Sequence, residues 1–381
     1  MEMCVNLKYG LISVDDHVQE HPDVWTARLS HSRWGDRIPH VAKNDDGAER
    51  WVVDSRPLDL PGVAVAAAAL TDRTRVPRRW DEVPRSVYDP EERLKAMDAD
   101  GVDYSVLYPT VAGVGGETFG RITDPDLELA CVQTYNDWLV EEWAGTSERF
   151  VPQCIVPLWP IDAAIAEIRR AVGRGHRGVV YPAVPMELRD VPHVNEPDYD
   201  PLWSTLEELD VPLCLHAGAS TAIQVPPPDA FSPAVAAAYR SITRQASSIS
   251  VLVHLLISRI LLRHPKLRVV FGESSLGWGA YQVEFADQQF NEDALYREGY
   301  DLKPSEMFRR QCYLTGWYGT AGIQTRDIIG TDNILWSTSF PLATSSWPTT
   351  RDYVAESFAG VPAEERDRML WGNAAKLYKM S

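Results

Sequence analysis

The sequence has few cysteines and no pairing pattern among them. Its 381 residues include five cysteines, and none of these stands in a Cys-x-x-Cys spacing. An odd number of scattered cysteines predicts neither a disulfide framework nor a cysteine metal site. This usage is typical of the reducing cytoplasm, which is the location we expect.

Long hydrophobic runs and an excess of positive charge are also missing. No stretch approaches the roughly 18 to 20 consecutive apolar residues that a membrane helix needs, and the opening segment MEMCVNLKYG lacks the basic and apolar parts of a signal peptide. The formal net charge is −17. Nucleic acids and anionic membrane surfaces attract clustered Lys and Arg, so we expect neither as a partner.

The sequence does contain an alternation of short apolar runs with longer segments of helical periodicity, which is typical of β-α units around a parallel sheet. The eight predicted strands are Gly10–Val14, Tyr104–Leu107, Val151–Val156, Gly178–Tyr181, Pro212–Leu215, Leu267–Phe271, Gln311–Thr315 and Ile334–Ser337. Each is too continuously apolar to have one face in water. We therefore predict an α/β fold, a closed (β/α)8 TIM-type barrel that forms a single domain over residues 1–381.

Two stretches interrupt this alternation, residues about 18–90 and 182–198. Both are rich in proline and charged residues and follow strand ends, where barrels carry the loops that shape substrate pockets. We predict that the first is an insertion after strand 1 that forms a lid or pocket wall. It contains four tryptophans, which can bury against the barrel, a second subunit or the substrate.

Ionisable residues stand where three of the predicted strands end. Asp15 and His17 are two apart in an extended strand, so both point into the barrel mouth, and a carboxylate and an imidazole so placed suit a metal ion. For this motif alone the alternative is structural, with Asp15 as a cap and His17 packed in the core. His216 ends the fifth strand. Glu273 ends the sixth, where a buried carboxylate needs a cation or a proton. Together these positions predict an active site at the carboxyl end of the barrel.

Other candidates are weaker. Tyr181, Trp317 and Tyr318 follow strand ends, and we expect these aromatic side chains to line the substrate pocket, with plain packing as the alternative. His254 lies in the middle of a predicted helix, which favours a core or interface histidine over one that reaches the site from behind strand 6.

The sequence resembles the amidohydrolase-related family that includes aminocarboxymuconate-semialdehyde decarboxylase and the resorcylate decarboxylases. The resemblance spans nearly the whole chain and is carried by Asp15-x-His17, Arg93–Pro109, Tyr199–Trp203, Leu215–Gly218, Arg263–Glu273 and Trp371–Ala375. It implies that Asp15, His17 and His216 bind a divalent metal ion, which polarises the substrate and in hydrolytic relatives activates water. It also implies a homodimer.

Two positions depart from the family pattern. Where the family has Ser-Asp-Phe/Tyr-Pro-His after strand 8, this chain has Ser339 in place of the aspartate and Leu342 in place of the histidine. We expect Ser339 to contact the substrate. Where the decarboxylase relatives have a histidine after strand 6, this chain has Glu273, so Glu273 is expected to act as a metal ligand or a general base.

Two further carboxylates stand near the first strand. We expect Asp16 to be a second catalytic carboxylate and Glu20 to be a further metal ligand. Such an oxygen-rich set favours iron, manganese or zinc, with one or two ions per chain.

Three functions fit this pattern. The first is a metal-dependent hydrolase, in which a metal-activated water attacks the carbonyl of a small carboxylic acid derivative. The family includes a diiron thioesterase of diterpenoid antibiotic biosynthesis, and this resemblance implies an acyl-CoA thioester of a bulky apolar acid as substrate. The second is a metal-dependent, non-oxidative decarboxylase of an aromatic or unsaturated carboxylate. The third is a barrel that has lost its metal and binds a small molecule without turnover. The fold alone does not choose among them.

Overall fold

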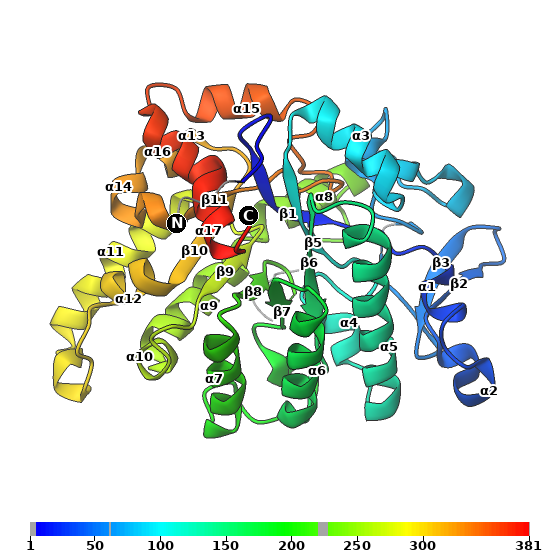
Figure 1. The fold of residues 1–381 in the computed structure, drawn as a ribbon, viewed down its shortest axis with the longest axis horizontal. Coiled ribbons are helices and arrows are strands. Elements are labelled where there is room, and N and C mark those ends of the chain that lie inside the picture. The colour runs from blue at the N-terminus through cyan, green and yellow to red at the C-terminus, as the bar shows by residue number, and fades with distance from the viewer. Residues whose placement is uncertain (1–4, 61, 220–227, 381) are drawn as a thin grey trace.

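The computed structural model describes residues 5–60, 62–219 and 228–380, and its centre is an eight-stranded parallel sheet that curls into a nearly closed barrel (Figure 1). In sheet order the strands are β1 (Ile12–His17), β5 (Tyr104–Tyr108), β6 (Phe150–Ile155), β7 (Gly178–Val180), β8 (Leu213–His216), β9 (Val269–Gly272), β10 (Cys312–Gly316) and β11 (Ile334–Trp336). The predicted barrel is confirmed. The strands are buried along almost their whole length, because helices cover the outside and side chains fill the inside.

The barrel closes between its first and last strands through the residues that follow β11. The backbone N–H of Ser339 donates to the carbonyl of Asp15 over 3.0 Å, and the N–H of His17 donates to the carbonyl of Phe340 over 2.7 Å. The side chains of Ser13 and Thr338 also meet at this seam. The segment after strand 8 therefore fixes the end of β1, where two of the predicted ligands stand.

Helices surround the sheet and join its strands. The longer ones are α3 (Pro90–Asp100), α5 (Pro125–Trp138), α6 (Ile161–Gly173), α7 (Asp200–Leu209), α8 (Pro233–Thr243), α9 (Ala246–Ile257), α11 (Gly277–Glu292), α12 (Pro304–Gln311) and α15 (Thr350–Ser357). The shorter ones are α1 (Asp23–Thr26), α2 (His31–Trp34), α4 (Glu117–Gly120), α10 (Ile260–Arg263), α13 (Thr320–Gln324), α14 (Arg326–Ile329), α16 (Ala363–Asp367) and α17 (Asn373–Leu377). Asp89 and Asp124 cap α3 and α5 by accepting from backbone N–H groups of the first turn.

Residues 18–60 and 62–90 form an extension on the flank of the barrel beside α5 (Figure 1). It contains α1, α2 and an antiparallel sheet of β2 (His40–Lys43), β3 (Glu49–Val53) and β4 (Arg56–Pro57), which the sequence pattern did not predict. Trp25 and Trp51 are buried and pack edge to face, and Trp25 donates to the carbonyl of Cys131 in α5. At its other end, Ala68 donates to the carbonyl of Pro341 over 3.1 Å. The extension therefore packs on the barrel, next to the seam that carries Ser339.

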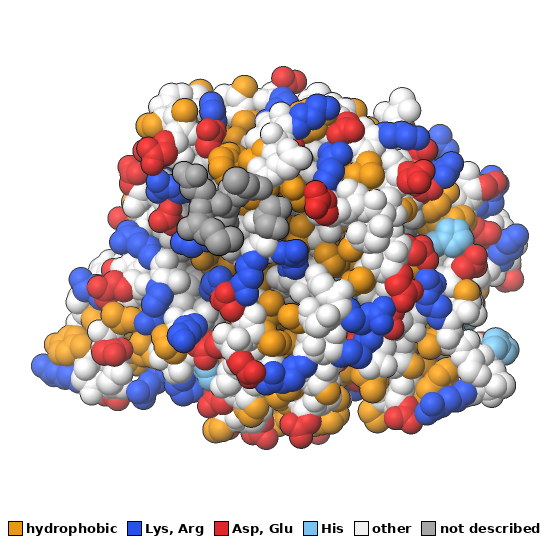
Figure 2. All heavy atoms as spheres, in the orientation of Figure 1, with side chains coloured by type: hydrophobic (Ala, Val, Ile, Leu, Met, Phe, Trp, Pro, Cys, Tyr) orange, Lys and Arg blue, Asp and Glu red, His pale blue; other side chains and the backbone are white. Residues whose placement is uncertain are grey.

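The surface drawn in Figure 2 intermingles acidic and basic side chains rather than separating them into large fields of one sign. Among the described residues, no helix is long and apolar enough to cross a membrane.

Candidate metal centre and active site

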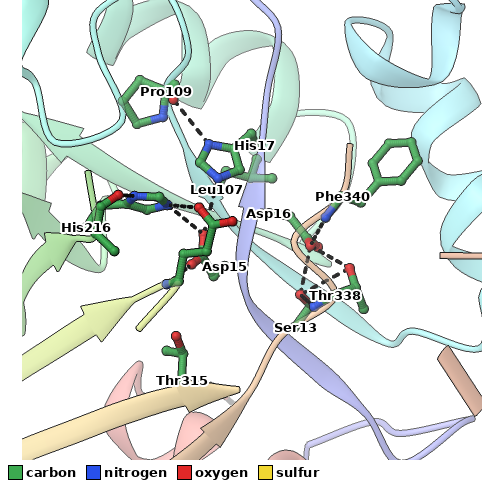
Figure 3. Close-up of polar contacts among 12 residues, drawn as sticks. Ser13, Asp15, Asp16, His17, Leu107, Pro109, His216, Thr315, Thr338 and Phe340 are labelled. Atoms are coloured by element: carbon green, nitrogen blue, oxygen red, sulfur yellow. Dashed lines mark hydrogen bonds and ion pairs between the residues drawn. The ribbon is translucent and has the colours of Figure 1, made fainter. Parts of the chain in front are cut away.

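Asp15 and His17 of β1 and His216 at the end of β8 point toward one another at the barrel mouth (Figure 3). Oδ1 of Asp15 lies 3.4 Å from Nε2 of His17 and 3.6 Å from Nε2 of His216. All three atoms are buried and have no hydrogen-bond partner among the described residues. Buried polar atoms are nearly always satisfied in native proteins, so three such atoms converging within 4.8 Å of one another form a set that fits a metal ion.

The second nitrogen of each imidazole fixes its orientation. Nδ1 of His17 lies 3.3 Å from the carbonyl of Pro109, and Nδ1 of His216 lies 2.8 Å from the carbonyl of Ala217. A carbonyl can only accept, so Nδ1 carries the proton in each ring and the Nε2 lone pair faces the cluster. The ring of Tyr108 packs against both imidazoles and supports them from β5.

The electrostatics of the cluster favour a positive charge at its centre. Burial alone would raise the pKa of Asp15, but the neighbouring imidazoles of His216 and His17 outweigh it and hold that pKa well below its usual range. Burial opposes charge on His216 as well, yet Asp15 and Glu273 raise its pKa above the ordinary histidine value. A divalent cation held between these groups would bind the same carboxylate and both Nε2 lone pairs.

Glu273 stands directly after β9 and completes the rim of this cluster. Its backbone has a positive φ of 47°, an uncommon conformation for a residue other than glycine. In this conformation its N–H donates to Oδ2 of Asp15, and its Oε2 lies 3.7 Å from Nε2 of His216. Thr344 donates to its other oxygen over 3.0 Å.

Arg244, which the sequence analysis did not identify, forms an ion pair with Glu273. It follows the last turn of α8, and its side chain is about one third exposed while Glu273 is buried. The carboxylate of Glu273 raises the pKa of Arg244, so the guanidinium stays charged. No motif marks this arginine in the sequence, and only the return of the chain from α8 to the barrel mouth places it beside β9.

The structure does not bring Asp16 and Glu20 into the cluster. Asp16 points away from it and accepts from Ser13, Ser105, Thr338 and the N–H of Phe340, as Figure 3 shows in part. The two oxygens of Glu20 accept the backbone N–H groups of Thr110 and Val111. The catalytic role expected for Asp16 and the ligand role expected for Glu20 therefore need correction. These carboxylates satisfy buried donors that only the folded chain brings to them.

The aromatic residues expected in the pocket have different surroundings. Tyr181 is buried and donates to the carbonyl of Leu158. Trp317 is buried against Tyr318, which is half exposed. A small cavity beside His216 is lined instead by Ala183, Leu215, Ser247, Ser248, Val251 and Phe271.

Two other residues of the predicted site, His254 and Ser339, each have a buried side-chain atom that finds no hydrogen-bond partner among the described residues. His254 of α9 packs against the ring of His193 at 5.5 Å and is not among the residues that converge on the cluster. Ser339 is fully buried beside Asp15, and its hydroxyl oxygen is one of these unpartnered atoms.

A further carboxyl group that the sequence analysis missed lies close to His216. Glu117 begins α4, in the loop that follows β5, and its side chain is partly buried and near enough to His216 for the two to interact electrostatically. The sequence signal for this position is the glycine-rich run Gly113-Val-Gly-Gly-Glu117, which lets a side chain fold back onto the backbone.

Comparison with known proteins finds a matching family model and similar sequences. The family model described as "Amidohydrolase" matches residues 39–380. A gamma-resorcylate decarboxylase of Rhizobium sp. (strain MTP-10005) is 26% identical over 325 residues, which cover 79% of this chain and 90% of that protein.

Solved structures share the fold at low sequence identity. An amidohydrolase of Mycobacterium avium subsp. paratuberculosis K-10 superposes with a TM-score of 0.76 at 20% identity and covers 98% of both chains. A dihydroxybenzoic acid decarboxylase of Polaromonas sp. JS666, solved with bound manganese and the inhibitor 2-nitroresorcinol, has a TM-score of 0.65 at 20% identity and covers 97% of both chains.

Proposed function

The chain belongs to the amidohydrolase family, and we propose that it is a divalent-metal-dependent enzyme that removes carbon dioxide from an aromatic carboxylate without an oxidant. The observation that carries the proposal is the convergence of three unpartnered ligand atoms, from Asp15, His17 and His216, beside the ion pair of Glu273 and Arg244. The similarity to a curated gamma-resorcylate decarboxylase along most of both chains supports the choice of reaction.

Asp15, His17 and His216 would hold the metal ion. When bound, the ion supplies a Lewis acid that polarises and orients the oxygen atoms of the substrate. One carboxylate and two imidazoles suit manganese, iron or zinc, and manganese is the first to test because the Polaromonas decarboxylase was solved with it.

Arg244 offers a cation for the carboxylate of the substrate. A guanidinium carries five N–H donors and can bind a carboxylate through two of them. Among the contacts between described residues, Arg244 donates its side chain to Glu273 alone, through Nη1. Glu273 would thus hold the guanidinium at the rim while its remaining donors face the substrate.

Hydrolysis is the second candidate, and the observation that favours it is Ser339. The resemblance to the decarboxylases implies an aspartate at this position, and the buried hydroxyl of Ser339 cannot replace its charge. A water held near Glu273 would then be the nucleophile. The relatives compared above include no thioesterase by name, so the thioester substrate expected from the sequence gains no support from them.

The test uses the full chain reconstituted with manganese and a panel of hydroxybenzoates that includes 2,6-dihydroxybenzoate. We expect carbon dioxide release that stops with a chelator, returns with manganese, and is lost in His216→Ala. His31→Ala, which changes a surface histidine that is 80% exposed, is the matched control and should retain wild-type turnover.

The hydrolase candidate is separated in the same assay by adding aryl esters and acyl-CoA thioesters. A metal-loaded protein that cleaves an ester or thioester and releases no carbon dioxide from any carboxylate would contradict the decarboxylase proposal.

A further inference from the structure

We propose that Arg93 is a positioning residue of the metal centre, which holds the backbone of His17 so that Nε2 of His17 faces the ion. The inference rests on the proposed function for the metal ion, and it is independent of the reaction that the ion serves. Arg93 lies in the first turn of α3, in the layer of helices around the barrel, and is only 1% exposed. It acts through His17 and has no contact with the substrate to make.

The guanidinium of Arg93 donates directly to the backbone of His17, from its Nη2 to the carbonyl over 2.8 Å. The N–H and the carbonyl of one strand residue face the same neighbouring chain, and the N–H of His17 donates to the carbonyl of Phe340. On that side Pro341 has no N–H to offer, and the N–H of Leu342 is bonded within its own turn. Arg93 therefore supplies the donor that the backbone lacks at the end of β1.

The same guanidinium also holds the second backbone partner of His17. Its central carbon lies 4.4 Å from the centre of the Phe340 ring and 5.3 Å from that of Trp143, where a cation is attracted to an aromatic face. Nε donates to the carbonyl of Ser86 over 2.7 Å and fixes the plane of the group. Arg93 thus holds the carbonyl of His17 directly and its N–H through Phe340.

This support reaches the centre from behind. Phe340 and His216 lie on opposite sides of β1 (Figure 3). The ring of His17 has one further polar contact, between its Nδ1 and the carbonyl of Pro109, and at 3.3 Å this contact is long for a hydrogen bond. The direction of the imidazole therefore depends on how firmly its own backbone is held.

Burying Arg93 is costly, which argues against a role in packing alone. All hydrogen bonds shown for its side chain among the described residues go to backbone carbonyls, and its Nη1 is buried without a partner there. A buried cation without a counter-ion is expensive, and an apolar side chain of similar volume is often at least as stable. The cost is offset by what the donors hold, and one of these groups is the carbonyl of a metal ligand.

The test is manganese binding by the full-length, metal-free protein with Arg93→Met, measured by titration calorimetry. Methionine fills much of the same volume and removes the charge and the donors. We expect the manganese Kd to rise by about 10- to 100-fold, as for other groups that orient a ligand. The melting temperature of the metal-free variant should stay close to that of wild type, because loss of the unpaired buried charge offsets the lost hydrogen bonds. An unchanged manganese Kd would overturn the inference.

Arg149→Met is the matched control. The side chain of Arg149 also donates to two backbone carbonyls, those of Val102 and Asp103, each over 2.7 Å. These residues precede β5, at the end of the barrel opposite its mouth. The manganese Kd of this variant should equal that of wild type. An equal loss of affinity in Arg149→Met and Arg93→Met would overturn the inference, because it would reflect a general loosening of the fold.

The visible absorption spectrum of the cobalt(II)-loaded protein reports the arrangement of the ligands without any turnover. Arg93→Lys keeps a charge and a donor but lacks the planar fork that spans the carbonyls of Ser86 and His17. We expect its absorption bands to shift from those of wild type and its manganese Kd to lie between those of wild type and Arg93→Met. An unchanged cobalt spectrum in Arg93→Lys would overturn the inference, even where Arg93→Met does not fold.

The same measurements separate this inference from the proposed reaction. A wild type that binds manganese, loses affinity on Arg93→Met and releases no carbon dioxide would support the role of Arg93 and contradict decarboxylation.

Discussion

At the scale of single residues, Ser339 determines how many ligands the metal centre can offer. Ser339 lies at the barrel seam, and its backbone N–H donates to the carbonyl of Asp15. Its φ is 52°, in the left-handed region that Asp and Asn enter more readily than most residues. Its hydroxyl oxygen is buried and unpartnered among the described residues. The backbone is therefore already suited to an aspartate, and the charge alone is missing.

We predict that Ser339→Asp strengthens manganese binding by about tenfold or more, on the scale of changes seen when the shell of a metal site is altered. The added carboxylate should also destabilise the metal-free protein, because an unpaired buried charge is costly. Metal affinity by titration calorimetry and thermal unfolding with and without manganese would measure both effects. Ser339→Ala is the control, and its metal affinity should equal that of wild type. An unchanged affinity in Ser339→Asp would mean that this side chain does not face the centre.

At the scale of elements, the loop between β5 and α4 is held by the carboxylate of Glu20, which lies three residues beyond the end of β1. Glu20 accepts the N–H groups of Thr110 and Val111 at 3.1 and 2.9 Å, at the start of the loop that carries Glu117. Burial raises the pKa of Glu20 to about 7, although hydrogen bonds from these N–H groups lower it in part. Glu20 therefore couples the stability of this loop to pH.

The direction of this coupling follows from proton linkage. Between about pH 4.5 and about pH 7 the unfolded chain loses the proton of Glu20 while the folded protein retains it, so the free energy of unfolding falls as pH rises, by up to about 1.4 kcal/mol per pH unit for this one group. We predict that Glu20→Gln removes this part of the slope in urea unfolding of the metal-free protein. Glu141→Gln, which changes a surface carboxylate about half exposed, should leave the slope unchanged. A wild-type slope in Glu20→Gln would contradict the raised pKa.

The limits of sequence reasoning are visible in the same elements. The eight strands were predictable because each is a continuous apolar run, and Asp15, His17 and His216 were predictable because strand ends meet at one face of a barrel. The full extent of β1 was not predictable from the sequence, because the strand continues through polar residues to His17, beyond the predicted end at Val14.

Loop-borne residues had no comparable periodic signal. Arg244 and Glu117 reach the centre only through the paths of the loops after β8 and β5. Asp16 and Glu20 were misplaced in the predicted site because the donors they satisfy come from distant segments.

At the scale of the whole molecule, the metal centre connects opposite sides of the barrel. In the sheet order β1-β5-β6-β7-β8-β9-β10-β11, strand β8 is four places from β1. Four is half of the eight-strand circuit, so the ligands on β1 and the ligand on β8 face each other across the barrel. An ion bound by Asp15, His17 and His216 would link β1 to β8, two strands that are not neighbours in the sheet and share no backbone hydrogen bonds.

We therefore predict that manganese raises the melting temperature of the protein. A ligand that binds only the folded state at about 100 times its Kd adds about 2.7 kcal/mol to the free energy of unfolding, which for a chain of this size corresponds to a rise of about 3 °C. Differential scanning calorimetry across a manganese series would measure the rise. His216→Ala keeps both ligands on β1 and removes the connection to β8, so its melting temperature should change little with manganese, whereas His31→Ala should respond like wild type. An equal rise in His216→Ala and wild type would show that the ion binds elsewhere. The metal centre at the barrel mouth would then not contribute to the stability of the barrel.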